Sequence, residues 1–214
     1  MLLNKCPNAI QIYDKIFDIE TNARLWLNIS IQLSKVNNAY QVIDILFSAI
    51  KNKKDINEEY NNKLLEKLYW FLNCGKTNNE IKTESEKARS GSNEKLYSFE
   101  KDDTLIFSAF YRTYKIDIEA ELDTLHWWKF MAMFNDLDEK SKLVGVYMYY
   151  RGLDINESSI YKHASEREKQ KILEMKNFVS LESKNMGSNI DNAEKEKIRL
   201  ERLKILEAKN GNRN

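Results

Sequence analysis

One stretch constrains the fold of this chain more than any other: residues 125–134, with the sequence LHWWKFMAMF. It holds two of the four tryptophans, two phenylalanines and two methionines, and it contains neither glycine nor proline. On a helix, its apolar side chains cover roughly 220° of the surface, more than twice the ~100° stripe of an ordinary surface helix. We therefore expect a helix that is clamped between neighbouring elements or that keeps part of its apolar surface for a partner.

The two sides of this helix are expected to differ. Trp128 lies near Leu125 and Ala132, and we expect that side in the core. The opposite side carries the predicted partner-binding residues Trp127, Phe130, Met131 and Phe134. The alternative is that the whole helix is core, because aromatic residues at helical spacing usually pack inside a protein.

Composition excludes several classes of protein. In 214 residues, 34 Lys and Arg balance 33 Asp and Glu, for a net charge of +1. Duplex-binding proteins usually carry a clear basic excess, so binding to nucleic acid is disfavoured. The two cysteines, Cys6 and Cys74, suit a reducing cytoplasm. The N-terminus has no apolar core of signal-peptide length, and no apolar run approaches the ~20 residues of a membrane span, so no membrane association is expected.

The periodicity predicts a mainly α protein, a compact multi-helix chain with a small N-terminal β-hairpin. The hairpin arms are residues 9–12 and 16–19. Helices are expected at 23–35, at 39–51 (mostly buried), at 57–73, and from Asp103, which is expected to cap its helix. Further helices are expected from Thr124, at 142–151 and at 165–181.

Four regions follow from these patterns. Residues 1–75 hold the hairpin and the first helices, and 76–96 form a polar linker or mobile loop, whose only apolar residues between Lys76 and Lys95 are Ile81 and Ala88. Residues 97–183 form an aromatic-rich helical region. Residues 184–214 form a charged helix or tail with Glu–Lys and Glu–Arg pairs three apart.

None of the candidate sites for chemistry meets the requirements of catalysis or of metal or cofactor binding. Gly75-Lys76-Thr77 resembles the end of a phosphate-binding loop, but it closes a helix instead of opening one. His126 and His163 stand far from each other and from any thiol, whereas zinc ligands come in closely spaced pairs. Asp102-Asp103 is expected to be a helix cap. We therefore predict no catalytic residue, no metal site and no enzymatic activity.

Several motifs together resemble a known family. They are Tyr97-Ser98-Phe99-Glu100, Asp102-Asp103, Ala109-Phe110, Tyr114-Lys115-Ile116-Asp117, Leu125-His126-Trp127-Trp128-Lys129-Phe130 and Tyr150-Arg151, with a weaker match at Tyr69-Trp70-Phe71-Leu72-Asn73-Cys74-Gly75-Lys76. In this order they resemble small proteins from the tail-gene cluster of tailed bacteriophages of Gram-positive bacteria. That family is similar in role to tail assembly chaperones.

The resemblance implies a chaperone that acts in the host cell cytoplasm and binds the tape measure protein and other tail proteins before the tail tube polymerises. It brings no catalytic residue or cofactor with it. A homo-oligomer is compatible with this role. The other functions considered are a structural component of the tail or virion and a nucleic-acid-binding module.

Overall fold

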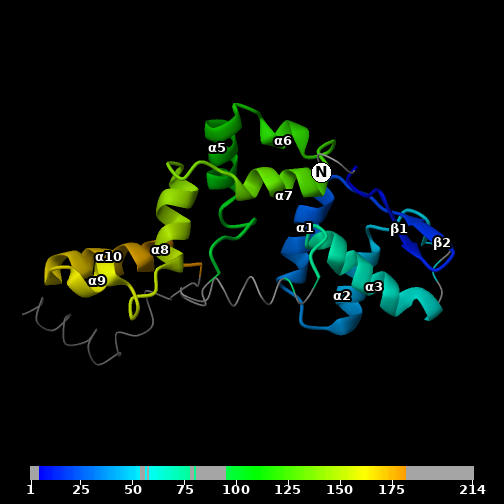
Figure 1. Ribbon diagram of the computed structural model, residues 1–214, viewed down its shortest axis with the longest axis horizontal. Coiled ribbons are helices and arrows are strands. Elements are labelled where there is room, and N and C mark those ends of the chain that lie inside the picture. The colour runs from blue at the N-terminus through cyan, green and yellow to red at the C-terminus, as the bar shows by residue number, and fades with distance from the viewer. Residues whose placement is uncertain (1–4, 54–55, 57, 78–79, 81–94, 182–214) are drawn as a thin grey trace, which may run out of the picture. The chain divides into compact units, whose positions relative to one another are not determined.

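The computed structural model describes residues 5–53, 56, 58–77, 80 and 95–181. In that part of the chain the structure is mainly α, with one two-stranded antiparallel sheet near the N-terminus, as predicted (Figure 1). The elements are β1 (Ala9–Ile12), β2 (Lys15–Asp18), α1 (Ala23–Leu33), α2 (Ala39–Phe47), α3 (Glu58–Leu72), α5 (Asp103–Tyr114), α6 (Ile118–Glu121), α7 (Trp127–Asn135), the π-helical η3 (Leu143–Met148), α8 (Tyr149–Gly152), α9 (Ser159–His163) and α10 (Glu166–Val179).

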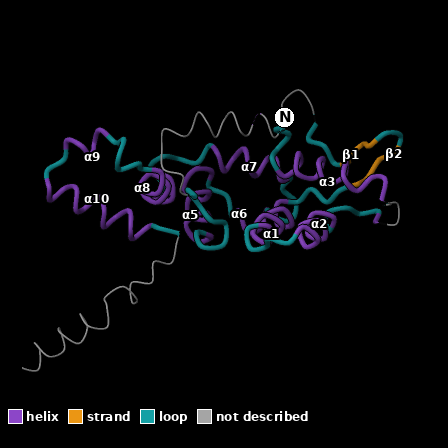
Figure 2. The backbone as a smooth tube through the Cα atoms, turned by 90° about the horizontal axis from the view of Figure 1, so that it is seen from below, coloured by secondary structure: helices purple, strands orange, loops and turns teal. Residues whose placement is uncertain are grey.

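The predicted hairpin is present. Its register pairs Ala9 with Asp18 and Ile12 with Lys15, and the two-residue turn places Tyr13 at a positive φ of 54°. Successive side chains of a strand point to opposite faces, and one face of the hairpin is buried against α3. There the Phe17 ring lies 5.8 Å from that of Tyr60. In Figure 2 the two strands lie beside α3.

Asparagines open the first two helices. The Asn22 Oδ1 accepts the Leu25 N–H at 2.9 Å at the start of α1, and Asn38 does the same for Tyr40 at the start of α2. The prediction that α2 is mostly buried was wrong, because Tyr40 is 79% exposed and Leu46 is the buried residue of this helix. Helix α2 packs mainly against α1 and α3, and its residues Val42, Ile45 and Phe47 are only half-buried at the edge of the core.

One hydrophobic core unites residues from both sides of segment 76–96. Trp26 of α1 packs on Phe71 of α3 with ring centroids 4.6 Å apart, and Phe110 of α5 stacks on Phe130 of α7 at 5.2 Å. The described residues up to Val179 belong to one compact unit. Most of the predicted linker (78–79 and 81–94) and the predicted tail (184–214) lie outside the described residues.

The helices after α7 differ in detail from the expectation. The helix predicted at 142–151 is π-helical from Leu143 to Met148 before it continues as α8. A Cβ at Gly145 would lie 2.4 Å from the Glu139 carbonyl oxygen, so the chain needs glycine there. The helix predicted at 165–181 is α10, and the short helices α6 and α9 were not predicted.

Candidate partner-binding site

The tryptophan helix begins three residues later than predicted from Thr124, and His126 caps it. The His126 Nδ1 accepts the Trp128 N–H at 3.0 Å, and its Nε2 lies 2.9 Å from the Pro7 carbonyl oxygen. Only the neutral tautomer with its hydrogen on Nε2 satisfies both contacts. Burial lowers the pKa of His126, which favours this neutral form.

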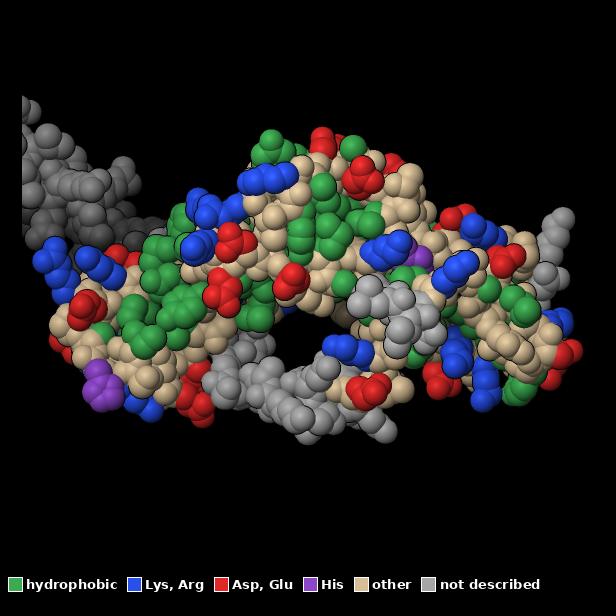
Figure 3. Space-filling model, turned by 45° about the horizontal axis from the view of Figure 1, so that its top comes forward, with side chains coloured by type: hydrophobic (Ala, Val, Ile, Leu, Met, Phe, Trp, Pro, Cys, Tyr) green, Lys and Arg blue, Asp and Glu red, His purple; other side chains and the backbone are tan. Residues whose placement is uncertain are grey.

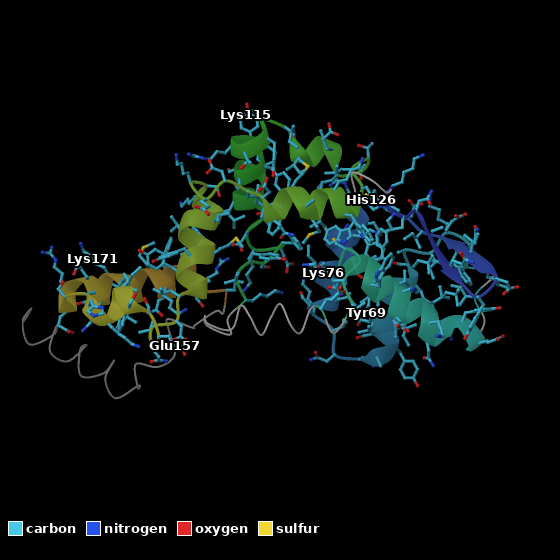
Figure 4. The ribbon with its side chains drawn as sticks, in the orientation of Figure 1. Tyr69, Lys76, Lys115, His126, Glu157 and Lys171 are labelled. Atoms are coloured by element: carbon cyan, nitrogen blue, oxygen red, sulfur yellow. The ribbon has the colours of Figure 1, made fainter. Side chains whose placement is uncertain are left out.

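The indole N–H groups of Trp127 and Trp128 both bind carbonyls at the C-terminal end of α3. The Trp127 Nε1–H donates to the Leu72 carbonyl at 2.9 Å, and the Trp128 Nε1–H donates to the Phe71 carbonyl at 2.8 Å. The last carbonyls of a helix have no partner within the helix, and the Trp127 indole supplies one to the Leu72 carbonyl. The Phe71 carbonyl accepts a second bond, from the Cys74 N–H, in addition to that from Trp128. In Figure 4, His126 lies beside the C-terminal end of α3, and its ring centroid is 5.6 Å from that of Phe71.

A Schellman turn completes the end of α3. The Gly75 N–H donates to the Trp70 carbonyl and the Cys74 N–H to the Phe71 carbonyl, with Cys74 at φ 56° and Gly75 at φ 87°. A Cβ at Gly75 would lie 3.0 Å from the Trp128 ring, so glycine also makes room for this indole. The interpretation of Gly75-Lys76-Thr77 as a helix stop is confirmed. Burial raises the pKa of the neighbouring Cys74 thiol to about 11.

The predicted assignment of the two sides of α7 was wrong. Trp127, Phe130 and Phe134 are at most 4% exposed, and their rings stack in sequence at 5.7 and 6.2 Å. The residues at 97 and 99 and helix α5 cover this side, which accounts for its burial. Met131 and Trp128 are half-buried, and Trp128 packs against the end of α3. The exposed edge expected at Trp127, Phe130 and Phe134 is therefore core.

Asp102 does more than the predicted cap. It occupies the N-cap position of α5, but its carboxylate accepts no hydrogen bond from that helix. It instead binds the Arg151 guanidinium through both oxygens, at 2.6 and 2.9 Å, and accepts the Ser98 N–H at 2.9 Å. Both charged side chains are 3% exposed. Arg151 also donates to the carbonyls of Leu96 and Val179, so one side chain joins the segment before α5, helix α8 and the end of α10.

A groove of about 440 Å³ opens beside this core. Its floor consists of the buried residues Ile106, Ile118 and Phe130, and half-buried Leu27 and Leu122 form walls. Figure 3 shows hydrophobic side chains gathered over α5, α6 and α7 in this area. We call it the α5–α6 groove. It is lined by Arg24, Leu27, Phe99, Asp103, Thr104, Ile106, Phe107, Ile118, Glu119, Leu122 and Phe130.

Two aromatic residues extend this apolar surface. Phe107 lines the groove and is 37% exposed, and Tyr111, one turn later on α5, is 55% exposed. Residues four apart on a helix share a face, so Phe107 and Tyr111 lie on the same exposed face of α5. The sequence contained this signal, because the apolar residues of α5 continue past its buried Ile106 and Phe110 to the adjacent face that carries Phe107 and Tyr111. The α7 residue that reaches the groove is Phe130, at its floor.

Comparison with known families decides the identity of the chain. Residues 2–181 match the family model described as "Bacteriophage Gp15 protein". The chain belongs to this bacteriophage protein family. The match covers the groove, both tryptophan contacts and the Asp102–Arg151 pair, and it extends well before the region from Tyr97 onward that carried the resemblance. No curated protein and no solved structure matches the chain.

Among the described residues, no group of three or more His, Cys, Asp or Glu side chains is placed to hold a metal ion. No described helix is long and apolar enough to cross a membrane. The α5–α6 groove combines a buried apolar floor with exposed aromatic residues at its edge.

Proposed function

We propose that this phage protein is a tail assembly chaperone that binds the tape measure protein in the α5–α6 groove before the tail tube polymerises. The observation that carries the proposal is the apolar groove with the exposed Phe107 and Tyr111 beside it. A long helical protein exposes apolar stripes that aggregate when they are uncovered. A groove formed by helices can cover such a stripe by helix-in-groove packing.

The chaperone role sets where the protein acts and how tightly it binds. The chaperone acts in the host cell cytoplasm, has no enzymatic activity and requires no cofactor. The tube subunits displace it, so each contact is of modest affinity and many copies act along one tape measure. Other tail proteins and a second copy of the chain are further partners in this proposal. The near-neutral net charge of +1 argues against a nucleic-acid-binding module.

Co-expression with the tape measure protein of the same phage tests this function. We expect the full chain to keep the tape measure protein in the supernatant and to co-purify with it. Phe107→Glu places a carboxylate in the apolar wall and should reduce recovery about tenfold, as expected for a central contact. Ile160→Glu is the matched control, because Ile160 is an exposed apolar residue of α9 outside the groove.

The two variants separate the outcomes. Normal recovery with Ile160→Glu and poor recovery with Phe107→Glu support the groove as the binding site, provided that circular dichroism shows both variants folded. Equal recovery with both would place the tape measure contact elsewhere. No recovery with the unmodified chain would contradict the chaperone function itself.

A further inference from the structure

The walls of the α5–α6 groove determine which backbone conformation can enter it. Most of its lining residues lie on α1, α5, α6 and α7, and helices pair most of their backbone groups internally. They therefore present no ladder of free N–H and C=O groups to an extended peptide. An α-helix carries its hydrogen bonds within itself, so it can enter an apolar groove without leaving buried backbone groups unpaired.

The charged residues that line the groove include more acidic than basic side chains. Its charged lining residues are Arg24, Asp103 and Glu119. Arg24 is already paired, because its Nε donates to the Asp123 carboxylate at 2.7 Å and its Nη2 to the Glu119 carbonyl at 2.9 Å. The carboxylates of Asp103 and Glu119 belong to exposed residues on α5 and α6, and Figure 3 shows acidic side chains bordering the apolar area on the α6 side. The rim therefore carries an excess of negative charge.

The Asp103 carboxylate forms hydrogen bonds with the neighbouring residue Thr104 and stays at the rim of the groove. Its Oδ1 accepts the backbone N–H of Thr104 at 2.5 Å and the Thr104 hydroxyl at 3.0 Å. Both donors are neutral groups, so these bonds place no positive charge beside the carboxylate. Opposite charges across an interface raise the rate of association and suppress wrong partners. A partner with basic residues beside its apolar stripe would meet this requirement.

We propose that the segment bound in the α5–α6 groove is an amphipathic helix whose apolar stripe is flanked by Lys or Arg residues that face Glu119 and Asp103. This inference rests on the proposed function, because it names the kind of tape measure segment that the chaperone recognises. Apolar residues at positions i, i+3 or i+4, and i+7 occupy the groove and contact Phe107. The basic flank lies against the acidic rim and sets the orientation of the helix.

Synthetic peptides that tile the tape measure protein test the inference on the full-length chain. Binding is measured by fluorescence anisotropy at low and at physiological salt. We expect the peptides that bind to be those with an apolar stripe and a basic flank. Glu119→Lys should weaken their binding about two- to tenfold, as expected for one or two exposed charge contacts, and the difference should shrink as salt rises. Glu157→Lys is the control, because it makes the same charge change at an exposed residue outside the groove.

A charge swap gives the sharpest result. A peptide in which one flanking Lys is changed to Glu should bind Glu119→Lys more tightly than it binds the unmodified chain. Equal affinity of all peptides for Glu119→Lys and Glu157→Lys would overturn the inference, as would preferential binding of acidic peptides. Concentration-dependent dimerisation that Phe107→Glu abolishes would assign the groove to a second copy of the chain and also overturn it.

Co-purification and peptide affinity distinguish a failure of the basic-flank proposal from a failure of the chaperone function. If the whole tape measure protein co-purifies with the chain but peptide affinity does not change in Glu119→Lys, the chaperone function stands and the basic flank is refuted. Binding of basic peptides without recovery of the tape measure protein would support the chemistry of the groove and contradict the function.

Discussion

At the scale of single residues, the adjacent Trp127 and Trp128 have different environments although both cap α3. Trp127 is 2% exposed and stacks on Phe130, whereas Trp128 is half-buried over Gly75. We predict that Trp127→Ala lowers the free energy of unfolding by ~3–5 kcal/mol and that Trp128→Ala costs less. Urea denaturation of the two variants measures this difference. An equal or larger cost for Trp128→Ala would contradict the packing described for α7.

His126 links stability to pH. Its folded-state pKa is lowered mainly by burial, so the unfolded chain binds a proton more readily than the folded one. The contribution of His126 is therefore complete above the unfolded pKa of ~6.5 and is lost as the pH falls through the lower folded pKa. We predict that the wild type loses this part of its stability as the pH falls below the unfolded pKa of ~6.5 and towards the lower folded pKa.

His126→Asn provides the comparison, because asparagine also caps helices and does not titrate in this range. Denaturation at several pH values should show a steeper decline for the wild type than for this variant. Parallel curves would mean that His126 does not accept the Trp128 N–H as a neutral ring.

At the scale of elements, the Asp102–Arg151 pair joins α5, α8 and α10 from a buried position. Removing one member of such a pair leaves an uncompensated charge, which typically costs ~3–5 kcal/mol. We predict a loss of this size for Asp102→Asn. Asp123→Asn is the control, because the Arg24–Asp123 pair is exposed and screened by solvent, so its loss should change stability little. Similar thermal denaturation midpoints for the two variants would contradict the buried position of the pair.

Most elements could be predicted from local signals, and the exceptions have physical causes. Asn22 and the hairpin alternation placed α1 and the strands correctly, since caps and periodicity act over a few residues. The start of α7 was placed too early because Thr124 is a common capping residue and a histidine cap is unusual. The π-helix depends on the contact between Gly145 and residue 139, which periodicity does not reveal.

At the scale of the whole molecule, the described helices before and after segment 76–96 share one core. Sequence periodicity showed that α7 has too much apolar surface for one neighbour, and the structure places α3 on one side and α5 with residues 97 and 99 on the other. It could not show which side was exposed, because that depends on elements distant in sequence. The α5–α6 groove was missed for the same reason, since Arg24 and Glu119 meet only in the folded chain.

Mass spectrometry of purified phage particles and of the infected-cell lysate tests the central claim of a chaperone most directly. A chaperone acts during assembly and leaves, whereas a structural component stays in the tail. The account predicts abundant peptides of this protein in the lysate, with at most traces in purified particles, and tail-less particles when its gene is deleted. A constant number of copies in every finished particle would contradict it and would assign the protein to the virion.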